Sequence, residues 1–264
     1  MFINRKRCKI SMKRVAIITG ASSGMGKEFA LKIDKCFNSI DEIWLIARRK
    51  DRLEELRREI NKSCLIICED ITEYGFKDRF CKMLRQENPN IKILVNCAGY
   101  GIYGAVDYES IEVEKGMVDV NCTALTTITL ATLPYMKKNS RIINLASSAG
   151  FLPQPNFSIY AATKSYVLSF SRSLNRELKK KGIYVTAVCP GPVATEFFTI
   201  AEKGIEKPAW KEMFMADAKD VVELAIKDSI NKKELSIYGI SMKLFLILTK
   251  LLPHKLILDV YSGK

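Results

Sequence analysis

Short apolar runs and longer amphipathic segments alternate along most of the chain. The apolar runs, such as RVAIIT at residues 14–19, are rich in β-branched residues and stop near glycine or polar residues. Runs of this length and composition are typical of buried strands. We predict strands at residues 14–20, 42–47, 64–70, 91–99, 141–148, 182–191 and 233–239.

The segments between these runs have the spacing of helices. In residues 51–60, for example, Leu53, Leu56 and Ile60 lie on one helical face. Strands that alternate with helices predict a parallel sheet covered on both faces. The expected fold class is therefore α/β, a three-layer, doubly wound parallel sheet of about seven strands in a single domain. We predict its helices at residues 26–37, 51–60, 72–87, 110–138 and 157–181.

The two ends of the chain differ in composition from the predicted domain, which spans residues 13–240. Residues 1–14 carry six basic residues and no acid, so we expect 1–12 to form a loose basic tail, with Met12 as an alternative start. They lack the long apolar run and cleavage site of a secretory signal. Residues 241–264 are apolar apart from interposed lysines and are broken by Pro253, too interrupted for a membrane span. We favour a tail that closes a pocket or contacts a sister subunit; a membrane surface and a core helix are the alternatives.

Composition narrows the class of protein. The net charge of +13 suits nucleic acid, an anionic membrane or an anionic cofactor, but no basic block is interleaved with aromatic residues, so we expect no nucleic acid partner. Eight scattered cysteines without a CxxC pair predict free thiols and a reducing cytoplasm. His254 is the single histidine, so we predict neither a metal site nor a Ser-His-Asp triad.

A glycine-rich segment, TGASSGMG at 19–26, lies between the first predicted strand and helix. Gly20, Gly24 and Gly26 would allow a tight turn and a close approach of the backbone to a pyrophosphate at the helix N-terminus. A plain strand-to-helix turn is the alternative, but it would not need three glycines. Ser22, Ser23 and Met25 in the same segment are further predicted contacts of a dinucleotide.

Two arginines follow the second predicted strand. An acid at this place would bind the ribose hydroxyls of NAD, whereas an arginine suits a 2′-phosphate. We therefore predict NADP(H), with Arg48 as the principal contact and Arg49 or Ser22 assisting; a solvated basic turn is the alternative. After the third strand, Asp70 and Ile71 would bracket the adenine, although Asp70 also suits a helix cap.

Tyr160 and Lys164 lie four residues apart among small residues in the last long helix. That spacing places them on one helical face. A free phenol has a pKa of about 10, and a nearby ammonium lowers it by favouring the phenolate. The pair therefore suits an acid–base function, with Tyr160 as the acid and Lys164 as the group that adjusts its pKa.

These motifs together resemble the short-chain dehydrogenase/reductase superfamily over residues 13–240, a family with a Rossmann-type fold. The resemblance rests on TGxxxGxG, Asn121, Ser147, Tyr160 with Lys164, and PGPVAT at 190–195. It implies that Ser147 binds the substrate oxygen, with Ser148 as the rival and a hydroxyl that caps a turn as the alternative. It also implies that Asn121 holds a water that links Lys164 to solvent; a helix-interior amide satisfied by the backbone is the alternative. It further implies that Lys164 holds the nicotinamide ribose and Thr195 the carboxamide. Other cofactor contacts would be Asn96, Ala98, Gly99, Pro190, Gly191 and Val193.

One position departs from the family pattern. The family's Asn-Asn-Ala-Gly reads Asn96-Cys97-Ala98-Gly99 here, and a thiol forms weaker hydrogen bonds than an amide. We expect a small local shift and no loss of the chemistry.

The predicted function is NADP(H)-dependent interconversion of a ketone and a secondary alcohol. Residues 196–216 lie where the family carries a lid, and their apolar side chains predict a hydrophobic, steroid-like or fatty-acyl-like substrate. These residues could equally serve to pack the lid. The alternative function is an NADP-binding redox sensor or scaffold with little turnover. We expect a homodimer or homotetramer.

Overall fold

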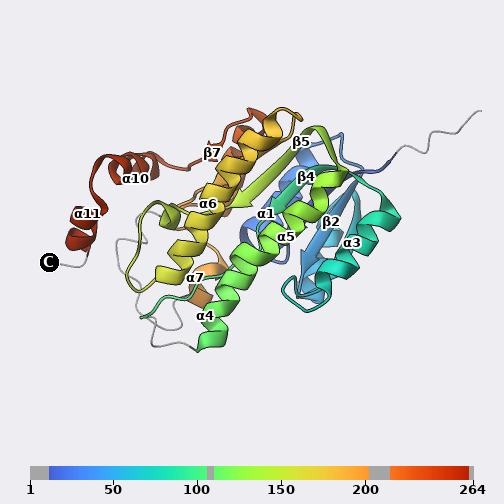
Figure 1. The fold of residues 1–264 in the computed structure, drawn as a ribbon. Helices are drawn as coiled ribbons and strands as arrows, with labels where there is room; N and C mark the ends of the chain where they lie inside the picture. Colours follow the sequence, from blue (N-terminus) through green and yellow to red (C-terminus); the bar gives the residue numbers. More distant parts are fainter. Residues whose placement is uncertain (1–11, 106–109, 202–214, 262–264) are drawn as a thin grey trace, which may run out of the picture.

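The structure is a computed structural model that describes residues 12–105, 110–201 and 215–261 (Figure 1). In these residues the strands are β1 (Arg14–Thr19), β2 (Glu42–Ala47), β3 (Ser63–Cys68), β4 (Asn90–Asn96), β5 (Met136–Leu145), β6 (Tyr184–Val188) and β7 (Leu235–Ser236). They form one parallel sheet in the order β3-β2-β1-β4-β5-β6-β7. This arrangement confirms the predicted doubly wound α/β fold.

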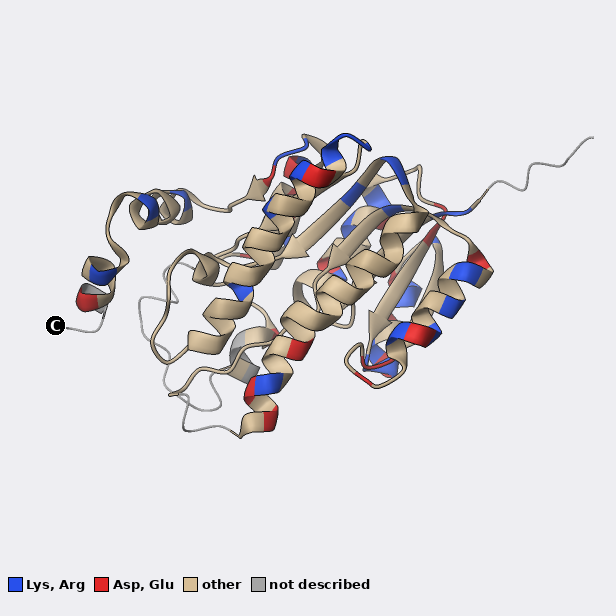
Figure 2. Ribbon diagram, in the orientation of Figure 1, with Lys and Arg blue, Asp and Glu red and all other residues tan. Residues whose placement is uncertain are grey.

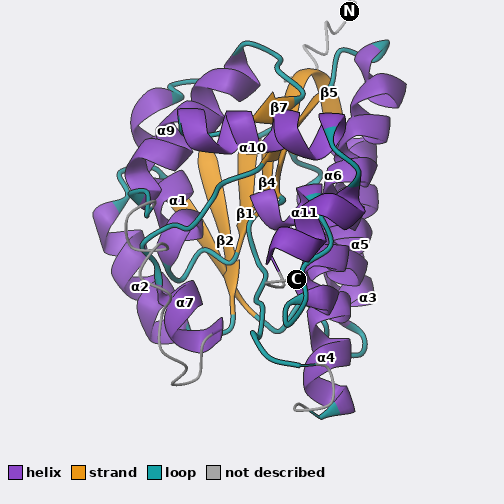
Figure 3. Ribbon diagram, turned by 90° about the vertical axis from the view of Figure 1, so that its left-hand side faces the viewer, coloured by secondary structure: helices purple, strands orange, loops and turns teal. Residues whose placement is uncertain are grey.

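Side chains of successive residues in β1 enter opposite cores, because a strand directs alternate residues to opposite faces. Ala16 and Ile18 pack with α1 (Gly24–Cys36), α2 (Lys50–Glu59) and α9 (Ala218–Ile230). Val15 and Ile17 pack with α3 (Phe76–Glu87), α5 (Leu125–Thr132) and α6 (Ser158–Lys179). Figure 3 shows the two helical layers on either side of the sheet.

The predicted helix at 110–138 is wrong in its continuity and its end. The segment consists of α4 (Ile111–Val118), a π-helical segment η1 (Asp119–Ala124), α5 and a short 3₁₀ turn η2 (Leu133–Tyr135). Pro134 stands in that turn, where it cannot continue an α-helix. The chain then enters β5 at Met136, five residues before the predicted strand. The helix predicted at 72–87 begins at Phe76, after Gly75 with φ 83°.

The C-terminal segment forms two further helices, α10 (Ile240–Leu251) and α11 (His254–Tyr261). In Figure 1 they extend beyond the end of the sheet, and Figure 3 shows α10 crossing in front of it. Of the helices that the structure describes, none is long and apolar enough to cross a membrane.

The order of the strands reverses between β1 and β4, which are neighbours in the sheet. Connections leave the carboxyl ends of these two strands in opposite directions, which opens a crevice for ligands there. The glycine-rich turn and the segment at 97–99 both lie at this edge.

Candidate active site

Two adjoining cavities lie at the carboxyl edge of the sheet. The smaller, of about 310 Å³, is bordered by the glycine-rich turn, Arg48, Arg49 and the residues after β3 and β4. The larger, of about 700 Å³, contains Ser147, Tyr160 and Lys164. Five residues border both cavities: Met25, Cys97, Gly99, Thr195 and Phe197.

The glycine-rich turn has no space for side chains at two of its positions. Gly20 has φ +68°, and a Cβ there would lie 2.8 Å from the backbone nitrogen of Ala98. A Cβ on Gly26 would lie 2.1 Å from the carbonyl oxygen of Gly20. The backbone of the turn therefore packs closely against the start of helix α1 and against the chain after β4, which only glycine allows. Ser22, Ser23, Gly24 and Met25 line that groove as well.

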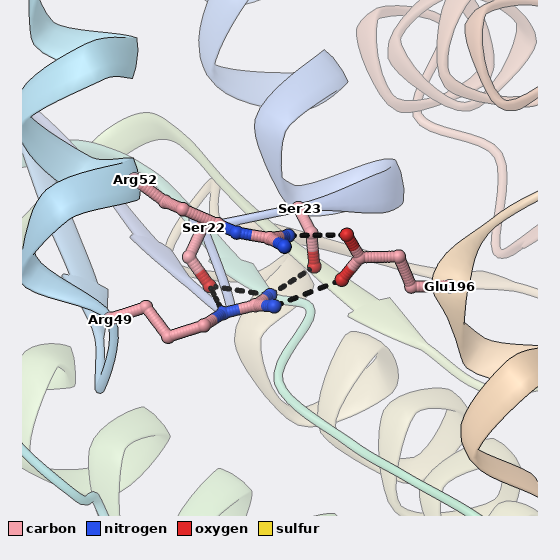
Figure 4. Close-up of polar contacts among 5 residues, drawn as sticks. All are labelled: Ser22, Ser23, Arg49, Arg52 and Glu196. Carbon is pink, nitrogen blue, oxygen red and sulfur yellow. Dashed lines mark hydrogen bonds and ion pairs between the residues drawn. The ribbon is translucent and has the colours of Figure 1, made fainter.

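Arg49, rather than Arg48, lies over the glycine-rich turn. Its Nη2 donates to the hydroxyls of Ser22 at 3.1 Å and Ser23 at 2.7 Å, and its Nε donates to Ser22 at 3.3 Å (Figure 4). The side chain of Arg48 is 75% exposed and lies 3.5 Å from the carboxylate of Asp70. Both arginines border the smaller cavity, and Arg49 is the one that contacts the serines of the glycine-rich turn.

Asp70 serves a local turn and also borders the smaller cavity with Ile71. Its Oδ1 accepts from the backbone nitrogen of Thr72 at 2.9 Å and from the Thr72 hydroxyl at 2.7 Å. Helix α3 starts only at Phe76, so Asp70 caps the turn after β3 and does not cap the helix.

Tyr160 lies in an aromatic pocket on helix α6. Its ring stacks on Phe157 with centroids 4.3 Å apart, and Phe197 lies against it at 5.4 Å. Burial raises the pKa of Tyr160 to about 12, and a hydrogen bond with Ser147 opposes that rise. In the protein without cofactor, the pKa of Tyr160 is therefore raised and not lowered as predicted from the nearby Lys164, because desolvation is the larger effect.

Lys164 lies one turn further along α6. Its Nζ donates to the carbonyl oxygen of Leu145 at 2.8 Å and lies 5.5 Å from the centroid of the Tyr160 ring. Burial lowers the pKa of Lys164 to about 8, so the ammonium still predominates at neutral pH. The structure thus brings a buried cation and a buried phenol to one cavity, as the spacing predicted.

Ser147 lines the larger cavity, whereas Asn121 does not. Ser147 follows β5, and its Oγ accepts from the backbone nitrogen of Ala149 at 3.1 Å while it lines the larger cavity beside Tyr160. Asn121 lies in the π-helical segment and is 1% exposed. Its Nδ2 donates to Tyr100 O and Thr163 Oγ1, and its Oδ1 accepts from Tyr100 N. The Asn121 side chain thus joins the chain after β4 to helix α6.

Asn96 does not line either cavity, although its predicted contact with the cofactor would require it to do so. It is 2% exposed, and its Nδ2 donates to Thr129 Oγ1 at 2.9 Å and to Asn144 Oδ1 at 2.8 Å. The side chain therefore ties β4 to α5 and β5. Ala98 and Gly99, in the same segment, do border the cavities.

Cys97 replaces the family's second asparagine without opening the local structure. The backbone nitrogens of Cys97 and Ala98 both donate to Thr19 Oγ1 at 3.1 Å. Burial raises the pKa of the Cys97 thiol to about 12, and Lys164 opposes that rise. The thiol is therefore protonated at neutral pH and does not act as a nucleophile.

The wall of the larger cavity comes from several distant segments. The predicted residues after β6, namely Pro190, Gly191, Val193 and Thr195, all line it. Met242 and Phe245 of α10 and Ile257 of α11 line it too. Sequence analysis did not identify these three residues, since their contact with the site depends on the path of the chain after β7.

The predicted lid is only partly described. Its first helix, α7 (Glu196–Ala201), places Phe197 in the cavity wall. The side chains of Phe198, Ile200, Trp210, Met213 and Phe214 lie outside what the structure describes. Val193 forms a β-bridge with Ala216, which brings the two ends of the lid segment together.

Residues 14–205 match a family model described as short chain dehydrogenase. The chain belongs to this family. An uncharacterized oxidoreductase of Staphylococcus epidermidis is 33% identical over 227 residues, which cover 85% of this chain and 96% of that protein. The human very-long-chain 3-oxoacyl-CoA reductase is 32% identical over 218 residues, covering 79% of this chain and 68% of the human protein.

Solved structures give the same result. A short-chain dehydrogenase from Sphingobium yanoikuyae, in complex with NADPH, aligns with a TM-score of 0.76 at 28% identity and covers 89% of this chain and 92% of that one. Membership of the family makes this protein an oxidoreductase that uses a nicotinamide cofactor. The groove fits such a group, because the glycine turn, the arginines and Asp70 line the smaller cavity, which shares five lining residues with the cavity that contains Tyr160.

Proposed function

We propose that this protein is an NADP(H)-dependent oxidoreductase that interconverts a hydrophobic ketone and a secondary alcohol. The observation that carries the proposal is the meeting of Ser147, Tyr160 and Lys164 in one apolar cavity that adjoins the groove over the glycine-rich turn. A nicotinamide bound there supplies the hydride and, when oxidised, a positive charge.

The protein supplies the proton. A phenol with a raised pKa stays protonated, so Tyr160 can donate its proton to the carbonyl oxygen as the carbonyl carbon is reduced. Ser147 donates a hydrogen bond to the same oxygen and orients it. The Lys164 ammonium stabilises the phenolate that remains and would hold the cofactor ribose. Asn121 would hold the water through which Lys164 exchanges a proton with solvent.

NADP(H) is the cofactor that the arginines favour. The guanidinium of Arg49, braced by Ser22 and Ser23, provides a positively charged donor for a 2′-phosphate. Arg48 is mostly exposed and serves as an auxiliary contact. Asp70 and Ile71 would flank the adenine.

The substrate is proposed from the cavity wall. Of its described lining residues, Lys164 is the one that carries a charge, and Leu152, Phe157, Phe197 and Phe245 give it an apolar surface. Such a wall favours long hydrocarbon substrates over sugars. Similarity to the human very-long-chain 3-oxoacyl-CoA reductase supports a fatty-acyl-like ketone ahead of a steroid-like one.

Oxidation of NADPH tests this function against a panel of 3-oxoacyl thioesters, steroid ketones and small diketones. Tyr160→Phe should lower kcat/KM by at least 100-fold, and Tyr166→Phe provides the matched control. Tyr166 lies on the same helix and is 42% exposed, with its hydroxyl 2.8 Å from Thr126 Oγ1. NADPH binding without turnover on any carbonyl would instead favour the redox sensor or scaffold.

A subunit contact is proposed for the face formed by α4, α5 and α6. Ile111 and Val118 of α4, Leu130 of α5 and Tyr166 of α6 are 79%, 42%, 54% and 42% exposed. Exposed apolar side chains on adjoining helices are typical of subunit interfaces. Leu130→Glu should convert a dimer or tetramer to a smaller species in light scattering, and an unchanged mass would exclude this face.

A membrane contact is proposed for the outer face of the tail. Seven apolar residues there expose 42% to 76% of their surface: Ile240, Leu244, Ile247, Leu248, Leu251, Leu252 and Leu256. Figure 2 shows lysines on both helices, and Lys243, Lys250 and Lys255 are exposed. An apolar face with interposed cations is complementary to an anionic lipid surface, whereas two copies would bring like charges together.

A further inference from the structure

The guanidinium assigned to the 2′-phosphate is already engaged by a carboxylate. Glu196, the first residue of helix α7, accepts from Arg49 Nη1 at 2.9 Å, and Arg52 donates to its other oxygen (Figure 4). Hydrogen bonds from Arg52 and Arg49 lower the pKa of Glu196, so the carboxyl group stays ionised at neutral pH. Its side chain is 44% exposed and borders the smaller cavity.

The hydrogen bonds leave Arg49 little spare capacity. Its Nε and Nη2 donate to Ser22 and Ser23, and its Nη1 donates to Glu196. A guanidinium has five N–H groups in a fixed plane. With Nε and Nη2 donating to the serines, Nη1 is the nitrogen left for a phosphate, and it already donates to Glu196.

Charge decides which partner leaves. Arg49 and Arg52 with Glu196 carry a net charge of +1, from two guanidinium groups and one carboxylate. A phosphate monoester carries nearly two negative charges at neutral pH. The cluster would then carry about −1 with Glu196 in place and about 0 without it, so the carboxylate leaves and the neutral serines stay.

We propose that Glu196 is an internal competitor for the cofactor 2′-phosphate and so sets how strongly the protein prefers NADP(H) to NAD(H). This inference rests on the proposed NADP(H) specificity. Glu196 is the first residue of α7 and directly follows Thr195, which borders both cavities.

The charge of Glu196 can be removed without changing its shape. Glu196→Gln should tighten NADPH binding about five- to tenfold, which is the repulsion of a carboxylate near a phosphate discounted for its exposure. NADH binding should change less than about twofold, since it lacks the 2′-phosphate. The gain for NADPH should shrink as salt is raised to about 0.5 M.

The experiment measures dissociation constants of NADPH and NADH by the change in nicotinamide fluorescence, without turnover. Glu223→Gln is the control. Glu223 lies on α9, where it pairs with Lys32 at 2.7 Å, and its replacement changes the net charge by the same amount as Glu196→Gln. A weaker or unchanged NADPH affinity in Glu196→Gln, or an equal gain for both nucleotides, overturns the inference and leaves the proposed function intact. A wild-type protein that binds NADPH no tighter than NADH overturns the NADP(H) proposal and this inference together.

Discussion

Replacing the proposed catalytic lysine should make the protein more stable while it abolishes turnover. Lys164 is 5% exposed, and burial lowers its pKa from 10.5 to about 8. That difference corresponds to about 3 kcal/mol by which the fold disfavours the charged form. In Lys164→Met this cost disappears, because methionine has a similar length and no charge.

The gain is reduced by one lost hydrogen bond. Lys164 Nζ donates to the carbonyl oxygen of Leu145 at 2.8 Å, and losing that donor costs about 1–2 kcal/mol. The net stabilisation of Lys164→Met at pH 7 is then about 1–2 kcal/mol. For a chain of this size, such a change raises the melting temperature by about 2–8 °C.

The sign of the effect depends on pH. Between pH 8 and 10.5 the unfolded lysine keeps a proton that the folded one has lost, so wild-type stability rises with pH in this window. The advantage of Lys164→Met is therefore full below pH 8 and reverses near pH 10.5, where only the lost hydrogen bond remains.

Urea unfolding of both proteins without nucleotide, at pH 7 and pH 10, measures this difference directly. Lys179→Met is the control, since Lys179 is exposed in the last turn of the same helix. A Lys164→Met protein that is less stable than wild type at pH 7, or whose difference from wild type does not change with pH, would refute the reasoning.

Three further predictions concern the pH profile, the glycine turn and the tail. Ketone reduction should fall about tenfold per pH unit above pH 8 as the Lys164 ammonium is lost, and a flat kcat/KM profile up to pH 10 would contradict its role. Gly26→Ala should weaken nucleotide binding at least tenfold, because its Cβ would meet Gly20 O at 2.1 Å; Gly104→Ala, with open space around it, should bind normally in the same titration. Wild-type protein should sediment with vesicles that contain anionic lipid and not with neutral ones, and Leu244→Ser with Leu251→Ser should stay in the supernatant. Equal sedimentation of the two proteins would exclude the outer face of α10 as the contact.

Local patterns predicted most of the fold. All seven strands were predicted, most of them because buried parallel strands read as continuous apolar runs such as EIWLIA at 42–47. The start of β5 was missed because its first residues, Met136 to Ser140, are mostly polar, which hides the strand. The break in the helix before it depends on a π-helical segment that has no marked sequence signal.

The residues of the site likewise divide into those that the sequence predicts and those that only contacts between distant segments bring together. Tyr160 and Lys164 could be placed on one helical face from their spacing, whereas Ser147 was predicted from the resemblance to the family. Arg49 could not be distinguished from Arg48, since adjacent residues in a turn point to different sides and only the structure shows which one faces Ser22. Glu196, Met242 and Phe245 reach the site through contacts between distant segments, which no local pattern records.

A crystal structure of the protein with NADP⁺ and a ketone analogue tests the central claim most directly. The account predicts that the hydroxyls of Tyr160 and Ser147 both lie within about 3.5 Å of the analogue's oxygen, with the nicotinamide ring next to its carbonyl carbon. An analogue oxygen bound by other groups, with the Tyr160 hydroxyl facing away from the ring, would contradict it.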